Sequence, residues 1–520
     1  MKDYGKLQNG SDIRGVAIAG KAGETPNLTP DVAADIARGF LAWLVREGGK
    51  KPEDLKLAIG RDPRITGPDL LAGLMEGFGP YGCRVLDCGL ASTPAMFMAT
   101  VFSDFACDGT IMITASHLPF NRNGFKFFTP GGGLDKEDIR DILAFAQDRA
   151  KATAILGEPA ADGTAAGASE AAADGQSAFG PEPADIITPY TAFLRELIVR
   201  GADLGEKPLE GMRITVDAGN GAGGFYARQV LEPLGADISS SQFLDPNGMF
   251  PNHAPNPEDK AAMESVSART LEAGADLGLI FDTDVDRSAA VDSHGREIAR
   301  NGIIAMAAAL VAEDHPGTTV VTDSITSRQL TEFLEKKLKL KHFRYRRGYR
   351  NVINKAFELN EEGIDSQLAI ETSGHAALKE NYFLDDGAYL ATKIVIKAAQ
   401  LHVEGKAIDS VIEDLKEPAD EREIRIPIQA EDFAACGSKV LMDLEEYVGK
   451  TEGVSLEKPN YEGVRINFPK GWCLLRKSLH DPLLPMNIAS DVPGGCDEIR
   501  RFMADFLSNY EELDQSVLEE

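Results

Sequence analysis

Three aspartates at alternate positions, Asp282, Asp284 and Asp286, directly follow the apolar stretch 277–281. Side chains two residues apart on an extended segment point to the same side, so these carboxylates can face one point. Their hard oxygens suit Mg²⁺, which also accepts phosphate oxygens as ligands. A calcium EF-hand needs glycine at its sixth position, where this loop has Arg287. The loop therefore predicts a magnesium site, with a solvated acidic turn as the alternative.

Arg287, the residue after the third aspartate, favours a site that handles phosphate. A guanidinium binds phosphate oxygens through two parallel hydrogen bonds, which an acidic turn in solvent does not need. Ser116 and His117 lie just past another apolar stretch, 111–114, and Lys126 follows ten residues after the serine. A lone serine in such a place could merely cap a helix. The chain contains no Gly-x-Ser-x-Gly, so this serine is not the nucleophile elbow of a hydrolase.

A third loop alternates a carboxylate, a hydroxyl and an imidazole. Glu371, Ser373 and His375 follow the apolar stretch 368–370. Together these groups can donate and accept hydrogen bonds with neighbouring hydroxyls of a sugar. Polar residues with a purely structural role in a core or on a surface would explain the loop about as well, so the loop alone does not establish a sugar-binding site.

The basic residues gather in a few places although the chain is acidic overall. With 54 Lys and Arg against 82 Asp and Glu, the formal net charge is −28, which argues against a nucleic-acid or membrane-surface binder. An acidic protein that binds a phosphorylated ligand must concentrate its cations locally. The candidates are Arg14, the group Arg344, Arg346, Arg347 and Arg350, and Arg476 with Lys477 beside Ser478. Such clusters on loops beside apolar strands predict phosphate-binding sites.

The cysteines and the first residues predict a cytoplasmic protein. Six cysteines without a Cys-x-x-Cys pair indicate free thiols in a reducing compartment. The first residues carry no apolar core of a secretory signal. The longest apolar run, 303–312, is too short to span a bilayer.

The elements that must position these loops recur three times along the chain. Each copy has an apolar strand with an amphipathic helix, then a short segment, then a second apolar strand that runs into one of the three polar loops. The strand and helix pairs are 57–62 with 68–78, 214–217 with 224–233, and 320–323 with 327–338; the short segments are 84–87, 236–238 and 342–345. Three self-similar copies of alternating strands and helices indicate a triplicated α/β domain. Ligands bind at the carboxyl ends of strands in such sheets, so we expect the three loops to face one central cleft.

The domain boundaries follow from this repeat and from one segment of biased composition. Segment 158–184 is rich in Ala, Gly, Asp and Glu and lacks Lys and Arg, which predicts a low-complexity disordered insertion. From about 413 the pattern changes to alternating strands and a C-terminal helix, which indicates a smaller α+β domain. The predicted division is the α/β domain of Ser116 at 1–157, the insertion at 158–184, the α/β domain of the aspartates at 185–300, the α/β domain of the third loop at 301–412, and the α+β domain at 413–520.

Five motifs, in order along the chain, resemble those of the α-D-phosphohexomutases, most closely the phosphomannomutase/phosphoglucomutase group. They are Asn9-Gly-Ser-Asp-Ile-Arg-Gly15, Thr114-Ala-Ser-His-Leu-Pro119 with Asn123-Gly-Phe-Lys126, Asp282-Thr-Asp-Val-Asp-Arg287, Glu371-Thr-Ser-Gly-His375 and Arg476-Lys-Ser-Leu-His-Asp-Pro482. The resemblance covers nearly the whole chain. In the last motif Leu479, His480 and Asp481 depart from the family pattern, while the arginine and the serine remain.

The resemblance implies an enzyme that moves a phosphoryl group between O1 and O6 of a hexose through a hexose 1,6-bisphosphate. Ser116 is then the phosphoryl carrier and, with the three aspartates, a ligand of Mg²⁺. The other implied catalytic residues are Arg14, His117, Lys126 and His375. Substrate binding is implied for Arg287, Arg346, Arg350, Glu371, Ser373, Arg476 and Ser478. The expected partners are hexose phosphates and the bisphosphate, without nucleic acid or membrane; the preferred sugar and the choice between monomer and homodimer stay open.

Two alternatives remain at this level. Gly219-Asn-Gly-Ala-Gly-Gly224 matches Gly-x-Gly-x-x-Gly between a strand and a helix, as in an NAD-dependent oxidoreductase. That fingerprint also requires an acidic residue at the end of the next strand. Asp237 does not meet this requirement, because it precedes the polar stretch 238–241. The other alternative is a non-catalytic hexose-phosphate-binding protein, which would have no use for a serine carrier, three aspartates and Lys126.

Overall fold

The structure, a computed structural model, describes residues 3–20, 23–159, 180–478 and 481–518. The chain divides into two units, one of Met1–Ala299 with Ser373–Val411 and one of Arg300–Thr372 with Ile412–Glu520. Most of the predicted disordered segment 158–184 lies outside the described residues; within it, Glu182–Pro183 forms strand β8. No helix in the described ranges is both long and apolar enough to cross a bilayer.

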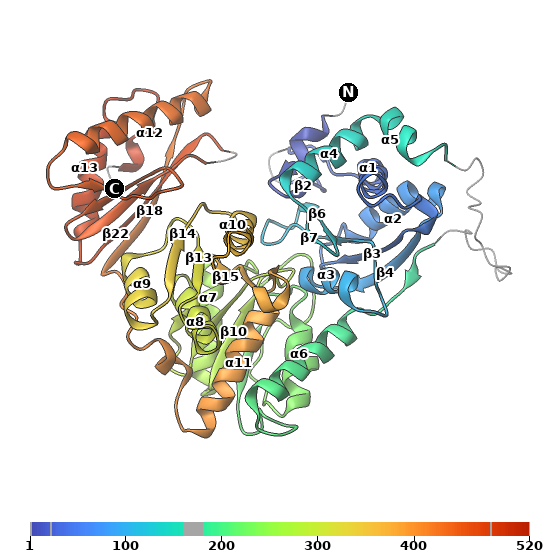
Figure 1. Ribbon diagram of the computed structural model, residues 1–520, viewed down its shortest axis with the longest axis horizontal. Helices are drawn as coiled ribbons and strands as arrows, with labels where there is room; N and C mark the ends of the chain where they lie inside the picture. The colour runs from blue at the N-terminus through green and yellow to red at the C-terminus, as the bar shows by residue number, and fades with distance from the viewer. Residues whose placement is uncertain (1–2, 21–22, 160–179, 479–480, 519–520) are drawn as a thin grey trace. The chain divides into compact units, whose positions relative to one another are not determined.

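The first sheet of the first unit is formed mostly by the N-terminal part of the chain, coloured blue to cyan in Figure 1. The Ser116 loop follows one of its strands. Its strand order is β1-β2-β6-β5-β3-β4-β8, with β7 paired to β6. The strands are β1 Gln8–Asn9, β2 Asp12–Val16, β3 Lys56–Arg61, β4 Arg84–Leu90, β5 Gly109–Ile113, β6 Arg122–Thr129, β7 Gly132–Gly133 and β8 Glu182–Pro183. The helices are α1 Pro30–Gly48, α2 Gly67–Phe78, α3 Thr93–Val101, α4 Lys136–Gln147 and α5 Arg149–Leu156. Because β3 and β5 run parallel, the loops that follow them leave the sheet at the same edge.

The second sheet of this unit is built around a hairpin that carries the aspartates. Its order is β12-β11-β10-β9, where β9 and β10 are parallel and β10 and β11 form the antiparallel hairpin. The strands are β9 Ile214–Asp217, β10 Leu277–Phe281, β11 Ser288–Asp292 and β12 Glu297–Ile298. Helices α6 Ile187–Ala202, α7 Lys260–Ala273 and α11 Gly387–Val403 and the π-helical turn Tyr226–Leu231 complete this part, with the hairpin of β16 Ala376–Leu378 and β17 Leu384–Asp385.

The second unit holds the third sheet and the C-terminal domain. In the third sheet β13 Thr319–Thr322 pairs in parallel with β14 Lys341–Arg344 and β15 Ser366–Ile370. Its helices are α8 Asn301–Asp314, α9 Arg328–Glu332 and α10 Tyr349–Glu361, and a π-helical turn spans Phe333–Lys337. Single 3₁₀ turns in the two units lie at Tyr4–Leu7, Pro52–Asp54, Gly79–Tyr81, Glu232–Leu234, Lys379–Asn381, Ile408–Ile412 and Ser516–Leu518.

The C-terminal domain is an antiparallel sheet with helices on one face (Figure 1). The order is β18-β22-β21-β20-β19, made of β18 Asp420–Pro427, β19 Ser455–Leu456, β20 Val464–Phe468, β21 Gly471–Leu475 and β22 Leu483–Ser490. Helices α12 Phe433–Lys450 and α13 Gly495–Leu507 pack on it around an apolar core that includes Ile466, Met486 and Met503. The chain is thus an α/β protein with a C-terminal antiparallel sheet domain, as the sequence predicted; the common cleft stays a prediction.

Candidate active site

The Ser116 loop begins where β5 ends and is held by hydrogen bonds to its main chain. Ser116 has φ +49°, a left-handed conformation that is uncommon for residues other than glycine. Its N–H donates to Thr114 Oγ1 at 2.9 Å, and that hydroxyl donates to Asp62 Oδ2 at 2.7 Å. The carboxylate of Asp62, just after β3, therefore fixes the peptide that carries the serine.

Arg64 holds the same loop from its carbonyl side. Its guanidinium is fully buried and donates to Asp62 Oδ2 at 3.1 Å. The remaining N–H groups donate to main-chain carbonyls of the loop, namely those of Ser116, Leu118, Pro119 and Arg122. One buried cation thus fixes the course of the chain from Ser116 to the start of β6.

The three aspartates lie in the turn between β10 and β11, and all are buried. Asp282 N donates to Arg287 O at 3.2 Å, which closes this turn, and Val285 within it has φ +68°. Ser116 Oγ donates to Asp282 Oδ2 at 2.9 Å, so the structure brings the predicted serine and the predicted metal loop into direct contact.

Arg287 joins the two loops through its guanidinium. Nη2 donates to Ser116 Oγ at 3.0 Å, to Asp282 Oδ2 at 3.1 Å and to His117 Nδ1 at 2.8 Å. Nη1 donates to Asn256 Oδ1 at 3.1 Å. Burial and the charge of Arg287 lower the pKa of His117 to about 3, so this imidazole is neutral and accepts a hydrogen bond from the guanidinium.

Lys126 and Arg14, both predicted catalytic residues, reach the same region from β6 and β2. Lys126 Nζ lies 2.9 Å from Asp284 Oδ2 and also pairs with Asp286. Burial works to lower the pKa of Lys126, but the two carboxylates outweigh burial and hold this pKa well above its usual range. Arg14 donates to Thr114 O and pairs with Asp12 at 2.7 Å.

The carboxylates of Asp282 and Asp286 differ in how readily each is ionised. Burial, together with the charges of Asp286 and Asp284, raises the pKa of Asp282 well above its usual range. Burial also works to raise the pKa of Asp286, but Lys126, His375 and Arg287 outweigh burial and hold this pKa well below its usual range. The cluster therefore carries more negative charge near Lys126 than near Ser116.

The donor set of this cluster fits a hard divalent cation. One oxygen of each carboxylate lies within 4.8 Å of the others. Asp284 Oδ1 and Asp286 Oδ1 are buried and accept no hydrogen bond from the residues that the structure describes. Buried carboxylate oxygens without a partner are unfavourable, and oxygen-binding cations such as Mg²⁺ satisfy them. The buried Asp282–Asp286 cluster can hold a metal.

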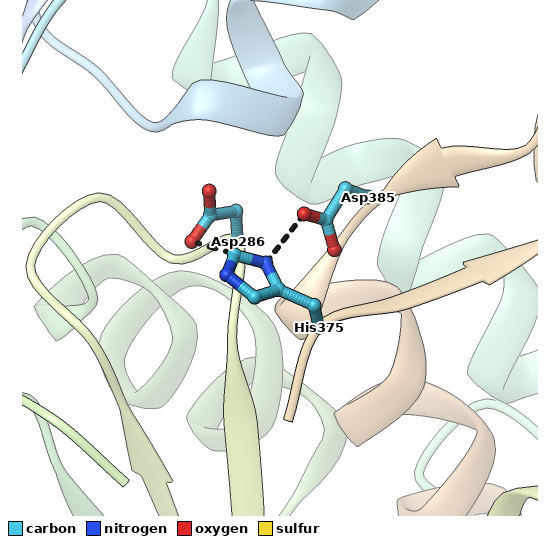
Figure 2. Close-up of side chains that lie close together, drawn as sticks. All are labelled: Asp286, His375 and Asp385. Carbon is cyan, nitrogen blue, oxygen red and sulfur yellow. Dashed lines mark hydrogen bonds and ion pairs between the residues drawn. The ribbon is translucent and has the colours of Figure 1, made fainter. Parts of the chain in front are cut away.

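His375 packs against the aspartate loop from the β16–β17 hairpin. Its Nδ1 lies 2.5 Å from Asp385 Oδ2 and 4.0 Å from Asp286 Oδ1 (Figure 2). Main-chain hydrogen bonds from Ser288 N to Gly374 O and from Gly387 N to Val285 O tie the hairpin to the loop. Burial works to lower the pKa of His375, but the charges of Asp385 and Asp286 raise it to about 9.

The structure divides the predicted third loop between the two units. Ser373 belongs to the first unit with His375, and its buried hydroxyl forms no hydrogen bond with the described residues. Glu371 belongs to the second unit, where its Oε1 accepts a hydrogen bond from Gly348 N at 2.6 Å.

Four of the predicted substrate-binding residues, Arg346, Arg350, Arg476 and Ser478, lie in the second unit. The guanidinium of Arg346 lies over the ring of Tyr345, and Arg350 is the second residue of helix α10. Arg476 is largely buried after β21, which lowers the pKa of its guanidinium, and its Nε has no hydrogen-bond partner among the described residues. Ser478 Oγ accepts from Asp481 N at 3.3 Å. The departures at 479 and 480 lie outside the described residues.

Family models of phosphoglucomutase/phosphomannomutase alpha/beta/alpha domains I, II and III match residues 5–153, 189–295 and 300–418, more than half of the chain. The chain belongs to this family. A phosphoglucomutase/phosphomannomutase of Thermococcus kodakarensis is 30% identical over 92% of this chain and 93% of its own length. A phosphomannomutase/phosphoglucomutase of Pseudomonas syringae is 28% identical over 88% of this chain and 89% of its own length.

Solved structures of phosphohexomutases share the fold. A phosphoglucomutase/phosphomannomutase family protein of Burkholderia thailandensis has a TM-score of 0.74 at 24% identity, covering 96% of both chains. An N-acetylphosphoglucosamine mutase of Aspergillus fumigatus, solved in complex with GlcNAc-6P and magnesium, has a TM-score of 0.51 at 14% identity, covering 90% of this chain and 79% of the other.

The protein is therefore a phosphohexomutase with phosphomannomutase/phosphoglucomutase activity, as the sequence predicted. This activity excludes the two alternative functions, an NAD-dependent oxidoreductase and a non-catalytic hexose-phosphate-binding protein. The Gly-x-Gly-x-x-Gly at 219–224 has a packing role, because a Cβ on Gly224 would lie 2.2 Å from Leu244 O.

Sequence reasoning missed three groups that hold the site together, namely Asp62, Arg64 and Asp385. A signal for the first two was present, because the charged run Arg61-Asp-Pro-Arg64 follows an apolar strand in the same way as the Ser116 loop does. No sequence signal pointed to Asp385, which lies ten residues beyond His375 and reaches it only through the β16–β17 hairpin.

Proposed function

We propose that this phosphohexomutase interconverts hexose 1-phosphate and hexose 6-phosphate through a phosphorylated Ser116 and a hexose 1,6-bisphosphate. The supporting observation is that Ser116 Oγ lies 2.9 Å from Asp282 Oδ2 and 3.0 Å from Arg287 Nη2. A hydroxyl between a carboxylate cluster and a buried guanidinium has the surroundings that phosphoryl transfer needs, which are positioning and neutralisation of charge.

In the first half-reaction a free hydroxyl of the hexose phosphate attacks the phosphorus on Ser116. The bond between that hydroxyl oxygen and phosphorus forms while the bond between Ser116 Oγ and phosphorus breaks, which leaves the electron pair on Oγ. Arg287 stabilises this oxygen, because Nη2 already donates to it. The second half-reaction runs in the opposite direction after the bisphosphate turns around, so the other phosphoryl group returns to Ser116.

The hydroxyl proton must be taken up by a neighbouring base and later returned. We assign this exchange to His375, which lies beside the aspartate loop: its imidazolium, favoured by a pKa of about 9, returns a proton, and its neutral form takes one up. Lys126 and Arg14 are further catalytic residues around the transferred group. His117 is neutral and bonded to Arg287, so its role is to hold the guanidinium toward Ser116.

We propose Mg²⁺ as the cation of this site, held by Asp282, Asp284, Asp286 and an oxygen on Ser116. Two buried carboxylate oxygens that lack a hydrogen-bond partner among the described residues support this choice. When bound, Mg²⁺ would neutralise charge on the phosphoryl oxygens. Lys126 already pairs with two of the aspartates, and it would limit their mutual repulsion in the metal-free protein.

The substrate must present either O1 or O6 to the same serine, so its distal phosphate needs one binding site in both orientations. We assign this site to Arg476 and Ser478, with Arg346 and Arg350, because the Arg476 Nε is buried and unpaired among the described residues. Glu371 and Ser373 are assigned to the sugar hydroxyls. The substrates we propose are glucose and mannose phosphates, and we propose a cytoplasmic location because the six cysteines, all within the described part of the chain, form no disulfide.

A coupled assay with glucose 1-phosphate and mannose 1-phosphate tests this proposal. Ser116→Ala should lose nearly all activity on both substrates, while the exposed Ser103→Ala in the same sheet domain should keep it. A fully active Ser116→Ala enzyme would exclude the serine as the carrier. Activity on only one of the two sugar phosphates would keep Ser116 as the phosphoryl carrier but restrict the proposed substrates to that sugar.

A further inference from the structure

The segment before helix α7 places an asparagine against Arg287. Asn256 Oδ1 accepts a hydrogen bond from Arg287 Nη1 at 3.1 Å. The same oxygen accepts from Glu258 N at 3.0 Å, and Asn256 O accepts from Asp259 N at 2.9 Å, where Asp259 caps the helix. Because two donors meet one amide oxygen, the side chain of Asn256 has a fixed direction. The guanidinium therefore has a rigid acceptor at Nη1, the nitrogen next to the one that donates to Ser116.

The glycine-rich stretch 219–224 supports this segment. Gly219 has φ +53°, and a Cβ there would lie 2.7 Å from the Cβ of Pro255, so this turn requires glycine for both conformation and space. Asn220 Oδ1 accepts from Asn252 Nδ2 at 2.8 Å. The stretch thus holds the chain just before the asparagine that contacts the guanidinium.

A buried carboxylate fixes the middle of the same segment. Asp217 is the last residue of β9, and its Oδ2 lies 3.0 Å from His253 Nε2. Gln242 Nε2 donates to the same oxygen at 2.7 Å, and Gly219 N donates to Oδ1 at 2.8 Å. The segment is therefore tied to the core of the second sheet, a support that is separate from the loop of the serine.

We propose that Asn256 is a positioning residue for phosphoryl transfer, which directs the guanidinium of Arg287 toward Ser116 Oγ. This proposal rests on the role of Ser116 as phosphoryl carrier proposed above. A guanidinium is planar and rigid, so a contact at Nη1 also fixes the direction of Nη2. Nη2 donates to Ser116 Oγ at 3.0 Å, where negative charge develops as the bond between this oxygen and phosphorus breaks. Asn256 acts on the reaction only through the arginine.

The other contacts of Arg287 do not replace this one. Asp282 and His117 contact Nε and Nη2, on the side of the guanidinium that faces Ser116. Glu258 Oε2 lies 3.7 Å from Nη1, and its side chain is 33% exposed. Of the two groups at Nη1, the amide is closer, and the main chain fixes its direction. Without the amide, Nη1 is free to turn toward solvent, which moves Nη2 away from the serine.

Two substitutions at one position separate the accepting oxygen from the rest of the side chain. Asn256→Ala removes the oxygen, whereas Asn256→Asp keeps one in the same place. In the alanine variant, transfer from phosphorylated Ser116 to hexose phosphate in a single turnover should slow by about 10²-fold, while the dissociation constant of the hexose phosphate changes by less than about threefold. The aspartate variant should transfer at least about tenfold faster than the alanine variant, because a carboxylate oxygen accepts from both donors.

Asn247→Ala is the matched control for loss of a turn. Asn247 Oδ1 accepts from Met249 N at 3.0 Å, so this side chain closes the same kind of turn as Asn256 but bonds to Met249 instead of Arg287. The control should transfer at the wild-type rate. A purely structural role for Asn256 would instead slow the two alanine variants equally.

Nitrogen NMR of arginine-labelled enzyme reads the guanidinium independently of activity. Arg287→Lys identifies the signals of this side chain by their loss. In the wild type, Nη1 and Nη2 should give separate signals, because each is held by its own acceptor. The two signals should merge in Asn256→Ala, where the group can rotate, and stay separate in Asn247→Ala.

The outcomes separate this proposal from the proposed function. If the wild type carries no phosphate on Ser116, the proposed function is wrong, and the role of Asn256 in transfer is wrong with it. If phosphorylated Ser116 transfers at the wild-type rate in Asn256→Ala, only the positioning role is wrong. Merged signals of Arg287 in the wild type would also overturn the positioning role, even if the alanine variant failed to fold.

Discussion

Replacement of Arg64 tests whether the Ser116 loop is held in place by a single buried cation. In Arg64→Met the four carbonyls of the loop lose their donor, and Asp62 remains buried without its charged partner. Removing one member of a buried ion pair costs about 3–5 kcal/mol. The lost hydrogen bonds belong to the same guanidinium and are not additive with this cost. We therefore expect the free energy of unfolding to fall by about 3–5 kcal/mol.

The effect on catalysis is expected to be larger than the effect on substrate binding. Arg64 contacts Asp62, the ring of Phe250 and main-chain carbonyls of the loop, and its side chain is fully buried. A shift of the serine by about 1 Å is enough to reduce kcat by about 10²-fold. KM should stay within about threefold, because the guanidinium is buried away from ligands.

Arg64→Lys is the matched variant for this test, because it keeps the charge next to Asp62 but lacks the planar fork. An ammonium cannot serve four carbonyls in fixed directions. We expect an intermediate loss of stability, about 1.5–3 kcal/mol, with a kcat still well below the wild type. Steady-state kinetics and urea unfolding measure both quantities. A lysine variant with wild-type kcat and stability would refute the role of Arg64 in holding the loop.

Three further predictions follow from other parts of the structure. Arg476→Ala should weaken binding of both hexose phosphates by about 1.5–3 kcal/mol, seen as higher KM values; values within about twofold of wild type would leave the distal phosphate unassigned. Asp284→Asn, or EDTA on the wild type, should abolish most turnover without unfolding the protein, and full activity in EDTA would contradict the metal site. Burial works to lower the pKa of His253, but the hydrogen bond and the charge of Asp217 outweigh burial and raise it. The protonated pair therefore stabilises the folded state fully below the unfolded pKa of about 6.5. This stabilisation is lost as the pH rises through the pKa that His253 has in the folded state. The stability gap between wild type and His253→Gln should therefore be wider at about pH 5.5 than at about pH 9, and an equal gap would contradict the charged pair.

The three α/β sheets were predictable because strands and helices leave a strong hydrophobic pattern. The local conformation was less predictable. The segment 224–233 reads as an amphipathic helix but contains the π-helical turn Tyr226–Leu231. The short segment 236–238 forms an isolated bridge, between Asp237 and Arg213, instead of a strand.

The aspartates were found from their spacing, although the backbone that brings them together differs from the expected one. The spacing argument assumed an extended segment. The structure has a hairpin turn closed by Asp282 and Arg287, with Val285 left-handed. The carboxylates converge because the turn is tight, and a sequence pattern of period two does not distinguish these two cases.

The sequence does not show which groups Arg64 and Asp385 contact, because these contacts run between strands. Arg64 reaches carbonyls more than 50 residues away, and Asp385 reaches His375 through a hairpin. Such contacts depend on strand order and register, which local patterns do not specify. The positions of the loops that contain Ser116, the aspartates and His375 could be predicted because each loop follows an apolar strand, and the roles of their residues stay predictions.

The phosphorylation state of Ser116 tests the central claim most directly. The purified enzyme, treated with a hexose 1,6-bisphosphate and digested, should carry phosphate on the peptide that contains Ser116. Mixing this phosphoenzyme with unlabelled hexose phosphate should transfer the group to sugar within one turnover. Phosphate on another residue, or a Ser116→Ala enzyme that still turns over at the wild-type rate, would contradict the account.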